Sequence, residues 1–274
     1  MRLTFALGMN PYQIILMNDL KAPNILVSFA YSKILADITY HPEYLILDSG
    51  AFTAWNTGKQ VDIDAYATWA LANQNKAEKV VAVNLDVIPG EAGRTSTKKE
   101  RAEGMKQSLI NADYLRSKGL EVMEVYHQDE PQVFLDTLLD RLPPNGILGI
   151  SPRNDVSLKS RIEWQNLVLR HLYQRYGIEN LPKTHGLAVT ALDSMKAFPY
   201  YSVDSSTWTT SMRFGQYITE WGKAKKLDEI IPKSGELNSK EAVLVGLRKS
   251  VESYSHVGTG ITSLWEQRGV RWKD

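Results

Sequence analysis

Three aspartates follow short runs of apolar residues, at Asp48, Asp86 and Asp204. Such runs are typical of buried parallel strands, so each carboxylate is expected at a strand end. Carboxylates that converge raise one another's proton affinity, which lets one stay an anionic nucleophile while another acts as a general acid or base. Two of them flanking a glycosidic carbon can break its bond through a covalent sugar intermediate. One such aspartate alone can equally cap the next turn, so the case rests on all three.

The segment after Asp48 adds detail to this candidate site. Ser49 and Gly50 allow a tight turn whose backbone N–H groups can face a ligand. Phe52 can either stack on a flat ring of that ligand or fill the core beneath the loop.

Other side chains could bind a metal, namely His127, Glu130 and His185. No two of them show the close spacing of a zinc motif on one helix. A structural role is therefore favoured, and no metal site is predicted.

Composition narrows the function classes. The chain carries 32 basic and 31 acidic side chains, and its net charge of +1 gives no global attraction to nucleic acid or to an anionic membrane. The absence of cysteine excludes disulfides, thiolate catalysis and sulfur-based zinc sites. No apolar run reaches membrane-spanning length and the amino terminus does not have the pattern of a signal peptide, which predicts a cytoplasmic protein.

Alternating apolar runs and amphipathic segments must position these residues. Eight candidate strands separated by helical patterns suit a closed sheet, so the sequence predicts an α/β fold, a single-domain (β/α)8 TIM-type barrel. We expect the barrel over residues 1–235 and a C-terminal helical extension over 236–274, with a helix at 239–254. The candidate strands are 3–7, 25–29, 44–47, 80–85, 122–126, 146–150, 184–189 and 200–203.

Several short motifs resemble those of the tRNA-guanine transglycosylases, a family that includes DNA-modifying relatives called DpdA. The resemblance covers residues 45–216, and the motifs occur in the order of the family. They are LeuAspSerGlyAlaPhe at 47–52, LeuAspValIlePro at 85–89, ValTyrHisGln at 125–128, LeuGlyIleSer at 148–151 and SerValAspSerSerThrTrp at 202–208.

This resemblance implies an exchange of guanine in a nucleic acid for a 7-deazaguanine base such as preQ0, without another cofactor. Asp204 would be the nucleophile and Asp48 the proton shuttle, while Phe52 would stack on the base. The remaining base contacts would come from Ser49, Gly50, Asp86, Gln128, Gly149 and Ile150. The missing cysteine zinc site favours the DNA-acting branch over the tRNA enzymes.

A nucleic-acid substrate also needs cations that hold phosphates. Candidates are Arg94, Lys98, Lys99, Arg101, Arg153 and Arg213. Ordinary surface charge is the alternative for each of them, and most of all for the lysines.

Two other classes of function stay open. An unrelated barrel hydrolase or lyase could use the same aspartates to bind magnesium and a small phosphorylated metabolite. A nucleic-acid-binding relative could keep the fold without turnover, because fold and function separate readily.

Overall fold

Short apolar runs form a sheet of nine strands in the order β5-β4-β3-β2-β1-β9-β8-β7-β6. This computed structural model describes residues 1–90, 96–189, 191–219, 223–230 and 239–272. All neighbouring strands of this sheet are parallel. The strands are β1 (Arg2–Leu7), β2 (Asn24–Ser28), β3 (Tyr44–Asp48), β4 (Lys79–Val83), β5 (Val122–Met123), β6 (Val125–His127), β7 (Ile147–Ser151), β8 (Lys183–Gly186) and β9 (Ser202–Ser205).

The sheet closes on itself through β5 and β6, which are the two halves of one extended segment interrupted at Glu124. β5 pairs with β4, and β6 pairs with β7. The carbonyl oxygen of Glu124 also accepts a hydrogen bond from the Gly149 N–H at 2.8 Å. Because β5 and β6 share one position, the strands form a (β/α)8 barrel, which confirms the predicted fold.

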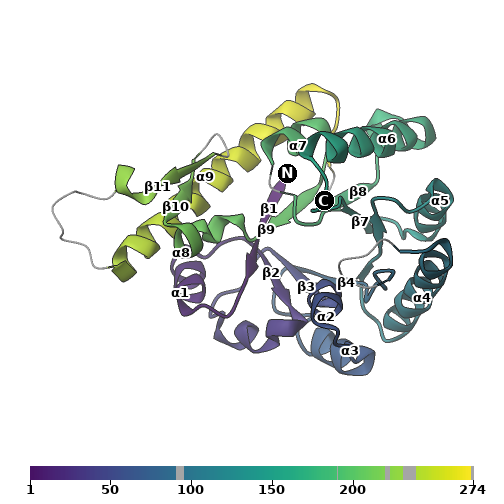
Figure 1. Ribbon diagram of the computed structural model, residues 1–274, viewed down its shortest axis with the longest axis horizontal. Coiled ribbons are helices and arrows are strands. Elements are labelled where there is room, and N and C mark those ends of the chain that lie inside the picture. Colours follow the sequence, from purple (N-terminus) through teal and green to yellow (C-terminus); the bar gives the residue numbers. More distant parts are fainter. Residues whose placement is uncertain (91–95, 190, 220–222, 231–238, 273–274) are drawn as a thin grey trace.

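Helices surround the barrel (Figure 1). After β2 the chain forms the 3-10 helix η1 (Phe29–Asp37) in place of an α-helix. The α-helices are α1 (Pro11–Leu20), α2 (Ala51–Thr57), α3 (Ile63–Ala72), α4 (Lys98–Ser117), α5 (Gln132–Arg141), α6 (Leu158–Tyr176), α7 (Leu192–Ala197), α8 (Thr210–Phe214) and α9 (Ser239–Gln267).

Successive side chains of each strand point alternately into the barrel and outward, so the strands contribute to two apolar layers, one inside the barrel and one between the strands and the helices. Tyr44 and Ile46 of β3 belong to a cluster made almost entirely of strand residues, which fills the barrel interior. Leu45 and Leu47 of the same strand pack outward with residues of the surrounding helices. Asp48 follows in the register of Tyr44 and Ile46, so its carboxyl group lies on the interior side, above that cluster.

The C-terminal helix α9 packs along the outside of β1. Trp265 Nε1 donates a hydrogen bond to the Met195 carbonyl oxygen at 2.9 Å, which ties α9 to α7. The predicted helix at 239–254 is present and continues to Gln267. The expected boundary between residues 235 and 236 lies outside the described residues.

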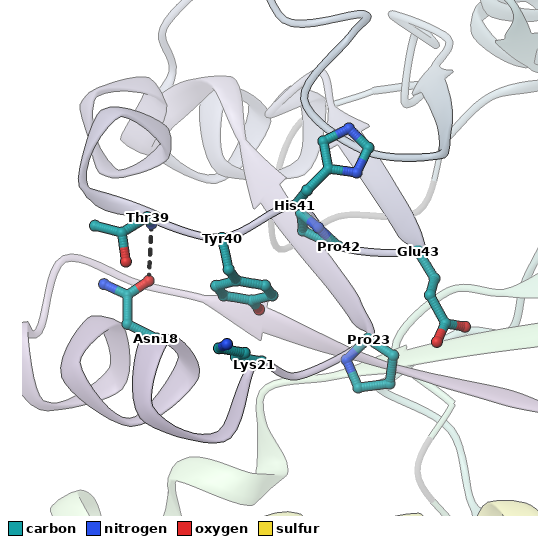
Figure 2. Close-up of a pocket in the computed structure, with 8 residues that line it drawn as sticks. All are labelled: Asn18, Lys21, Pro23, Thr39, Tyr40, His41, Pro42 and Glu43. Atoms are coloured by element: carbon teal, nitrogen blue, oxygen red, sulfur yellow. Dashed lines mark hydrogen bonds between the residues drawn. The ribbon is translucent and has the colours of Figure 1, made fainter.

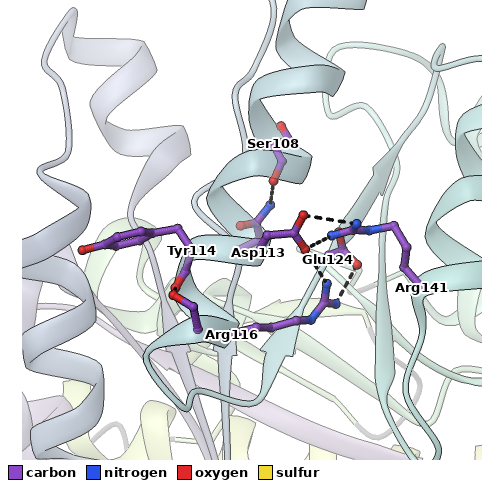
Figure 3. A network of polar contacts seen from close by, with 8 residues as sticks. Ser108, Asp113, Tyr114, Arg116, Glu124 and Arg141 are labelled. Carbon is purple, nitrogen blue, oxygen red and sulfur yellow. Dashed lines mark hydrogen bonds and ion pairs between the residues drawn. The ribbon is translucent and has the colours of Figure 1, made fainter.

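A buried glutamate at the break between β5 and β6 anchors the outer layer (Figure 3). The side chain of Glu124 is 3% exposed and pairs with Arg116 at 2.6 Å and with Arg141 at 3.1 Å. Arg141 also pairs with Asp113 at 2.6 Å. These ion pairs join α4 and α5 to the strand that closes the barrel.

Among the described residues, none of the helices combines the length and apolar character needed to cross a bilayer.

Candidate active site

The carboxyl ends of the barrel strands define one end of the molecule, which we call the barrel mouth. Asp48 is the last residue of β3, Asp86 follows β4, and Asp204 lies near the end of β9. Burial, with smaller contributions from the charges of Asp204 and Asp86, raises the pKa of Asp48 to about 6, and the hydrogen bond that Asp48 accepts from the Gly50 N–H at 3.1 Å opposes that rise. Asp86 and Asp204 therefore both lie close enough to Asp48 for their charges to act on its carboxyl group.

His127, at the end of β6, is paired with one of these carboxylates. Its Nε2 lies 2.7 Å from Asp86 Oδ2, and the two side chains are 25% and 10% exposed. Burial lowers the pKa of His127, but the hydrogen bond and charge of Asp86, with the charge of Glu130, outweigh it and raise the pKa to about 9. The ring is therefore an imidazolium at neutral pH.

Glu130 supports His127 from the following turn. Its Oε2 accepts a hydrogen bond from the His127 backbone N–H at 2.7 Å. Burial raises the pKa of Glu130 to about 7, while the positive charge of His127 opposes that rise. The turn requires a left-handed conformation at Asp129, with φ of 80°, which is strained for a residue other than glycine.

A second histidine–aspartate pair lies on β8 and β9. His185 Nε2 is 3.2 Å from Asp204 Oδ1, its Nδ1 is 2.8 Å from Ser202 Oγ, and its side chain is fully buried. The Ala188 N–H donates to the same Asp204 oxygen at 2.8 Å. Ala188 has φ of 52°, so β8 ends at Gly186, earlier than predicted, and the chain turns its amide toward Asp204.

Sequence reasoning overlooked both pairs. It treated the two histidines as possible metal ligands or structural residues, although His127 follows an apolar run in the same way as the aspartates. His185 lies within the predicted strand at 184–189, and this position could have indicated that its side chain is buried next to a neighbouring strand. In the described part of the chain, no three His, Asp or Glu side chains lie close enough to hold a metal ion.

The turn after β3 contains three more predicted site residues. Ser49 is buried, and its Oγ accepts a long hydrogen bond of 3.4 Å from the Ala51 N–H. Gly50 has φ of 76°, and a Cβ there would lie 3.3 Å from the Ala30 nitrogen, so glycine suits this position. Phe52 is 58% exposed on α2, which makes the core alternative for this ring wrong.

The other predicted base contacts are engaged within the protein. Gln128 Oε1 accepts from the Arg153 backbone N–H at 3.0 Å. The Gly149 N–H donates to the Glu124 carbonyl oxygen, and the Ile150 carbonyl oxygen accepts from the Leu187 N–H at 3.0 Å. The Ile150 side chain is buried in the outer layer.

Of the predicted phosphate ligands, Arg94 lies outside the described residues. Lys98 and Lys99 begin α4, where Lys99 pairs with Glu103 at 3.8 Å, and Arg101 donates to the Ser96 carbonyl oxygen at 2.6 Å. Arg153 pairs with Asp129 and Asp155, each at 2.5 Å, so its charge is already compensated. Arg213 is exposed on α8.

A cavity, whose lining residues Figure 2 shows, lies among the segments that precede β2 and β3, at the end of the barrel opposite the mouth. It has a volume of about 470 Å³ and is lined by residues that precede β2 and β3, among them Lys21, Tyr40 and Glu43. Asn18 Oδ1 closes one wall by accepting from the Thr39 N–H at 3.0 Å. In barrels of this kind the amino-terminal end of the strands serves stability, so we place the chemistry at the mouth.

No family model and no curated protein matches this sequence. A fructose-1,6-biphosphate aldolase from Coccidioides immitis resembles the structure with a TM-score of 0.46 and 10% identity, over 94% of this chain and 92% of that one. Tryptophan synthase from M. tuberculosis gives 0.45 and 9%, over 92% of each chain. N-acetylneuraminate lyase from Mycoplasma synoviae gives 0.41 and 15%, over 96% and 85%. These low values concern only the arrangement of strands and helices.

These comparisons correct the resemblance to the tRNA-guanine transglycosylases. No model of that family, or of any other, matches the sequence. The predicted glycosyltransferase activity, the DNA-modifying branch and the insertion of a 7-deazaguanine base were therefore wrong. The motifs behind them are short, and each is an apolar strand followed by polar residues, which is a pattern that parallel barrels repeat.

Proposed function

We propose that this chain is an enzyme that moves protons at a carbon next to a carbonyl group of a small molecule, as lyases and isomerases do. One observation carries the proposal. The pKa of Asp48 is raised to about 6, in part by the charge of Asp86. Asp86 is in turn paired with His127, and the pKa of that imidazole is raised to about 9. Two groups whose pKa values lie on opposite sides of 7 supply an ionised base and a protonated acid in one site at neutral pH.

Asp48 is the base in this proposal. Above pH 6 it is ionised, and its raised pKa gives it a greater affinity for a substrate proton than an exposed aspartate has. It takes the proton from the carbon, and the electron pair of the C–H bond forms a C=C bond. The carbonyl oxygen gains the negative charge.

His127 stabilises that oxygen. The imidazolium carries N–H groups on both ring nitrogens, and Nε2 faces Asp86. The Nδ1–H group is then the proton that His127 offers to the oxyanion. Asp86 and Glu130 are positioning residues, because they hold the ring and keep it charged.

Asp204 acts on Asp48 through charge. His185 and the Ala188 N–H orient its carboxylate, and its charge raises the proton affinity of Asp48. Asp204→Asn should therefore leave the base in place but make it weaker.

Hydrogen–deuterium exchange into substrate tests this proposal. The protein in D₂O is mixed with α-keto acids, aldoses, ketoses and their phosphates, and ¹H NMR follows loss of the signal of the carbon next to the carbonyl. We expect exchange with the wild type and a loss of at least about a hundredfold for Asp48→Asn, the scale of general base catalysis. Asp37→Asn, at an exposed aspartate of η1, is the matched control and should exchange as the wild type does.

Two outcomes would count against the proposal. Equal exchange by the wild type and Asp48→Asn would remove Asp48 as the base, and no exchange with any compound would remove the reaction class. Parallel runs with EDTA and with added Mg²⁺ show whether these groups work alone or beside a cation.

A further inference from the structure

Large apolar side chains remain exposed on one half of the barrel mouth. Met9 is 71% exposed, Phe52 58%, Val87 37% and Tyr31 36%. They follow β1, β3, β4 and β2 respectively, and these four strands are consecutive neighbours in the sheet. The loops that carry them therefore lie side by side around the mouth. We call these four residues the apolar rim.

Contacts join three of these segments, those that follow β2, β3 and β4. A Cβ on Gly50 would touch Ala30 at 3.3 Å, so the turn after β3 packs directly on the segment after β2. Trp55 Nε1 donates to the Gly90 carbonyl oxygen at 2.9 Å, which ties α2 to the loop after β4. The Phe52 and Trp55 rings lie 6.1 Å apart with their planes 31° from parallel.

The apolar rim adjoins the proposed catalytic groups. Phe52 is in the first turn of the helix that follows Asp48, and Val87 comes directly after Asp86. The other half of the mouth, beyond β6 and β7, carries the charged side chains Asp129, Glu130 and Arg153. The segments around Asp48 and Asp86 therefore expose apolar side chains, whereas the segments after β6 and β7 carry charged ones.

We propose that the substrate carries an apolar group, which lies on the apolar rim while its carbonyl end reacts between Asp48 and His127. This inference rests on the proposed function. Apolar side chains that line one side of an active site and expose their area to water gain free energy when a ligand covers them. The division of the mouth fits a molecule with one apolar and one polar end.

The test pairs two double variants. Met9→Ser with Phe52→Ser removes the most exposed side chains of the rim. Val133→Ser with Leu167→Ser is the matched control, because these residues are 69% and 60% exposed on α5 and α6, outside the mouth. Circular dichroism verifies that both variants are folded.

The first readout is binding of the fluorescent probe anilinonaphthalene sulfonate. We expect the rim variant to bind it about tenfold more weakly than the wild type, and the control to bind it unchanged. Competition by decanoate against competition by naphthoate tells a chain from a ring. Equal weakening in both double variants, or no binding by the wild type, would overturn the inference.

The second readout is the exchange reaction with pyruvate and with a medium-chain α-keto acid. The rim variant should raise KM for the longer acid by about tenfold, leaving kcat and the values for pyruvate unchanged. An equal change for both acids would overturn the inference. The two proposals fail in different ways, because Asp48→Asn removes turnover but leaves the rim intact. If the wild type binds the probe at the rim but exchanges no substrate, the proposed function is wrong while the apolar rim remains a binding surface.

Discussion

His127 Nε2 lies 2.7 Å from Asp86 Oδ2, although 41 residues separate the two along the chain. They meet because β5, which pairs with β4, continues into β6 at the closure of the barrel. The ion pair therefore spans the point at which the sheet closes. It forms only when the barrel is closed, so the charge of His127 depends on the folded barrel.

Removing Asp86 should lower the pKa of His127. With Asp86→Asn, burial of the ring is no longer opposed by the partner's charge, so the pKa falls from about 9, which NMR titration of the ring detects. Because the pKa of His127 is higher in the folded chain, the ion pair stabilises the folded state fully below pH 6.5, the unfolded value. This stabilisation is lost as the pH rises to about 9. The loss of unfolding free energy in the variant, at most about 3 kcal/mol, should be largest below pH 6.5 and shrink by pH 9. A pH-independent loss would contradict this.

Replacing the proposed base should stabilise the fold. Asp48 has a pKa of about 6 in the folded chain against 3.8 ordinarily, so its stabilisation is present below pH 3.8 and is lost as pH rises through 6. Asp48→Asn removes the buried charge, and we expect about 1 to 3 kcal/mol more unfolding free energy at pH 8. Urea titration measures it. A variant less stable than the wild type at pH 8 would show that the carboxylate is not penalised by burial.

The exchange rate should depend on pH as a bell. Asp48 must be ionised, so kcat/KM should fall below about pH 6, and His127 must be protonated, so it should fall above about pH 9. Asp204→Asn removes a charge that raises the Asp48 pKa, so the acid limb should move to lower pH while the basic limb stays. Movement of the basic limb alone would point to another assignment of the two groups.

Breaking the ion pairs of Glu124 should cost stability without touching the site. Glu124→Gln leaves Arg116 and Arg141 without their buried partner, and we expect a loss of about 2 to 4 kcal/mol in urea unfolding. Asp113→Asn is the matched control at the exposed end of the network, where the carboxylate is 62% exposed, and it should cost less than about 1 kcal/mol. Equal losses would mean that burial of Glu124 is not the cause.

Relieving the left-handed backbone at Ala188 should stabilise the chain. Ala188→Gly removes a Cβ at φ of 52° and keeps the N–H bond to Asp204, so we expect a gain of about 0.5 to 1 kcal/mol. Ala102→Gly in the exposed part of α4 should lose about 1 kcal/mol, because glycine is unfavourable inside helices. Thermal unfolding of both variants compares the two, and a loss at Ala188 would contradict the strain.

The strands and the strand-end carboxylates could be predicted from local pattern. Runs such as the one before Asp48 are apolar on both faces because parallel barrel strands are buried on both faces, and this property is visible in consecutive residues. The same generality explains the failure of the family resemblance. Apolar runs followed by polar turns fit many barrels, so five of them in order do not single out one chemistry.

The sequence by itself determined the barrel, the positions of its strands and the presence of Asp48, Asp86 and Asp204 at the strand ends, because these follow from hydrophobic pattern along the chain. Only the tertiary structure decided that His127 pairs with Asp86 and His185 with Asp204, and that Phe52 faces solvent. The reason is physical. Pairing and burial depend on which strands become neighbours and on how far each turn twists before the next helix, and distant residues set both.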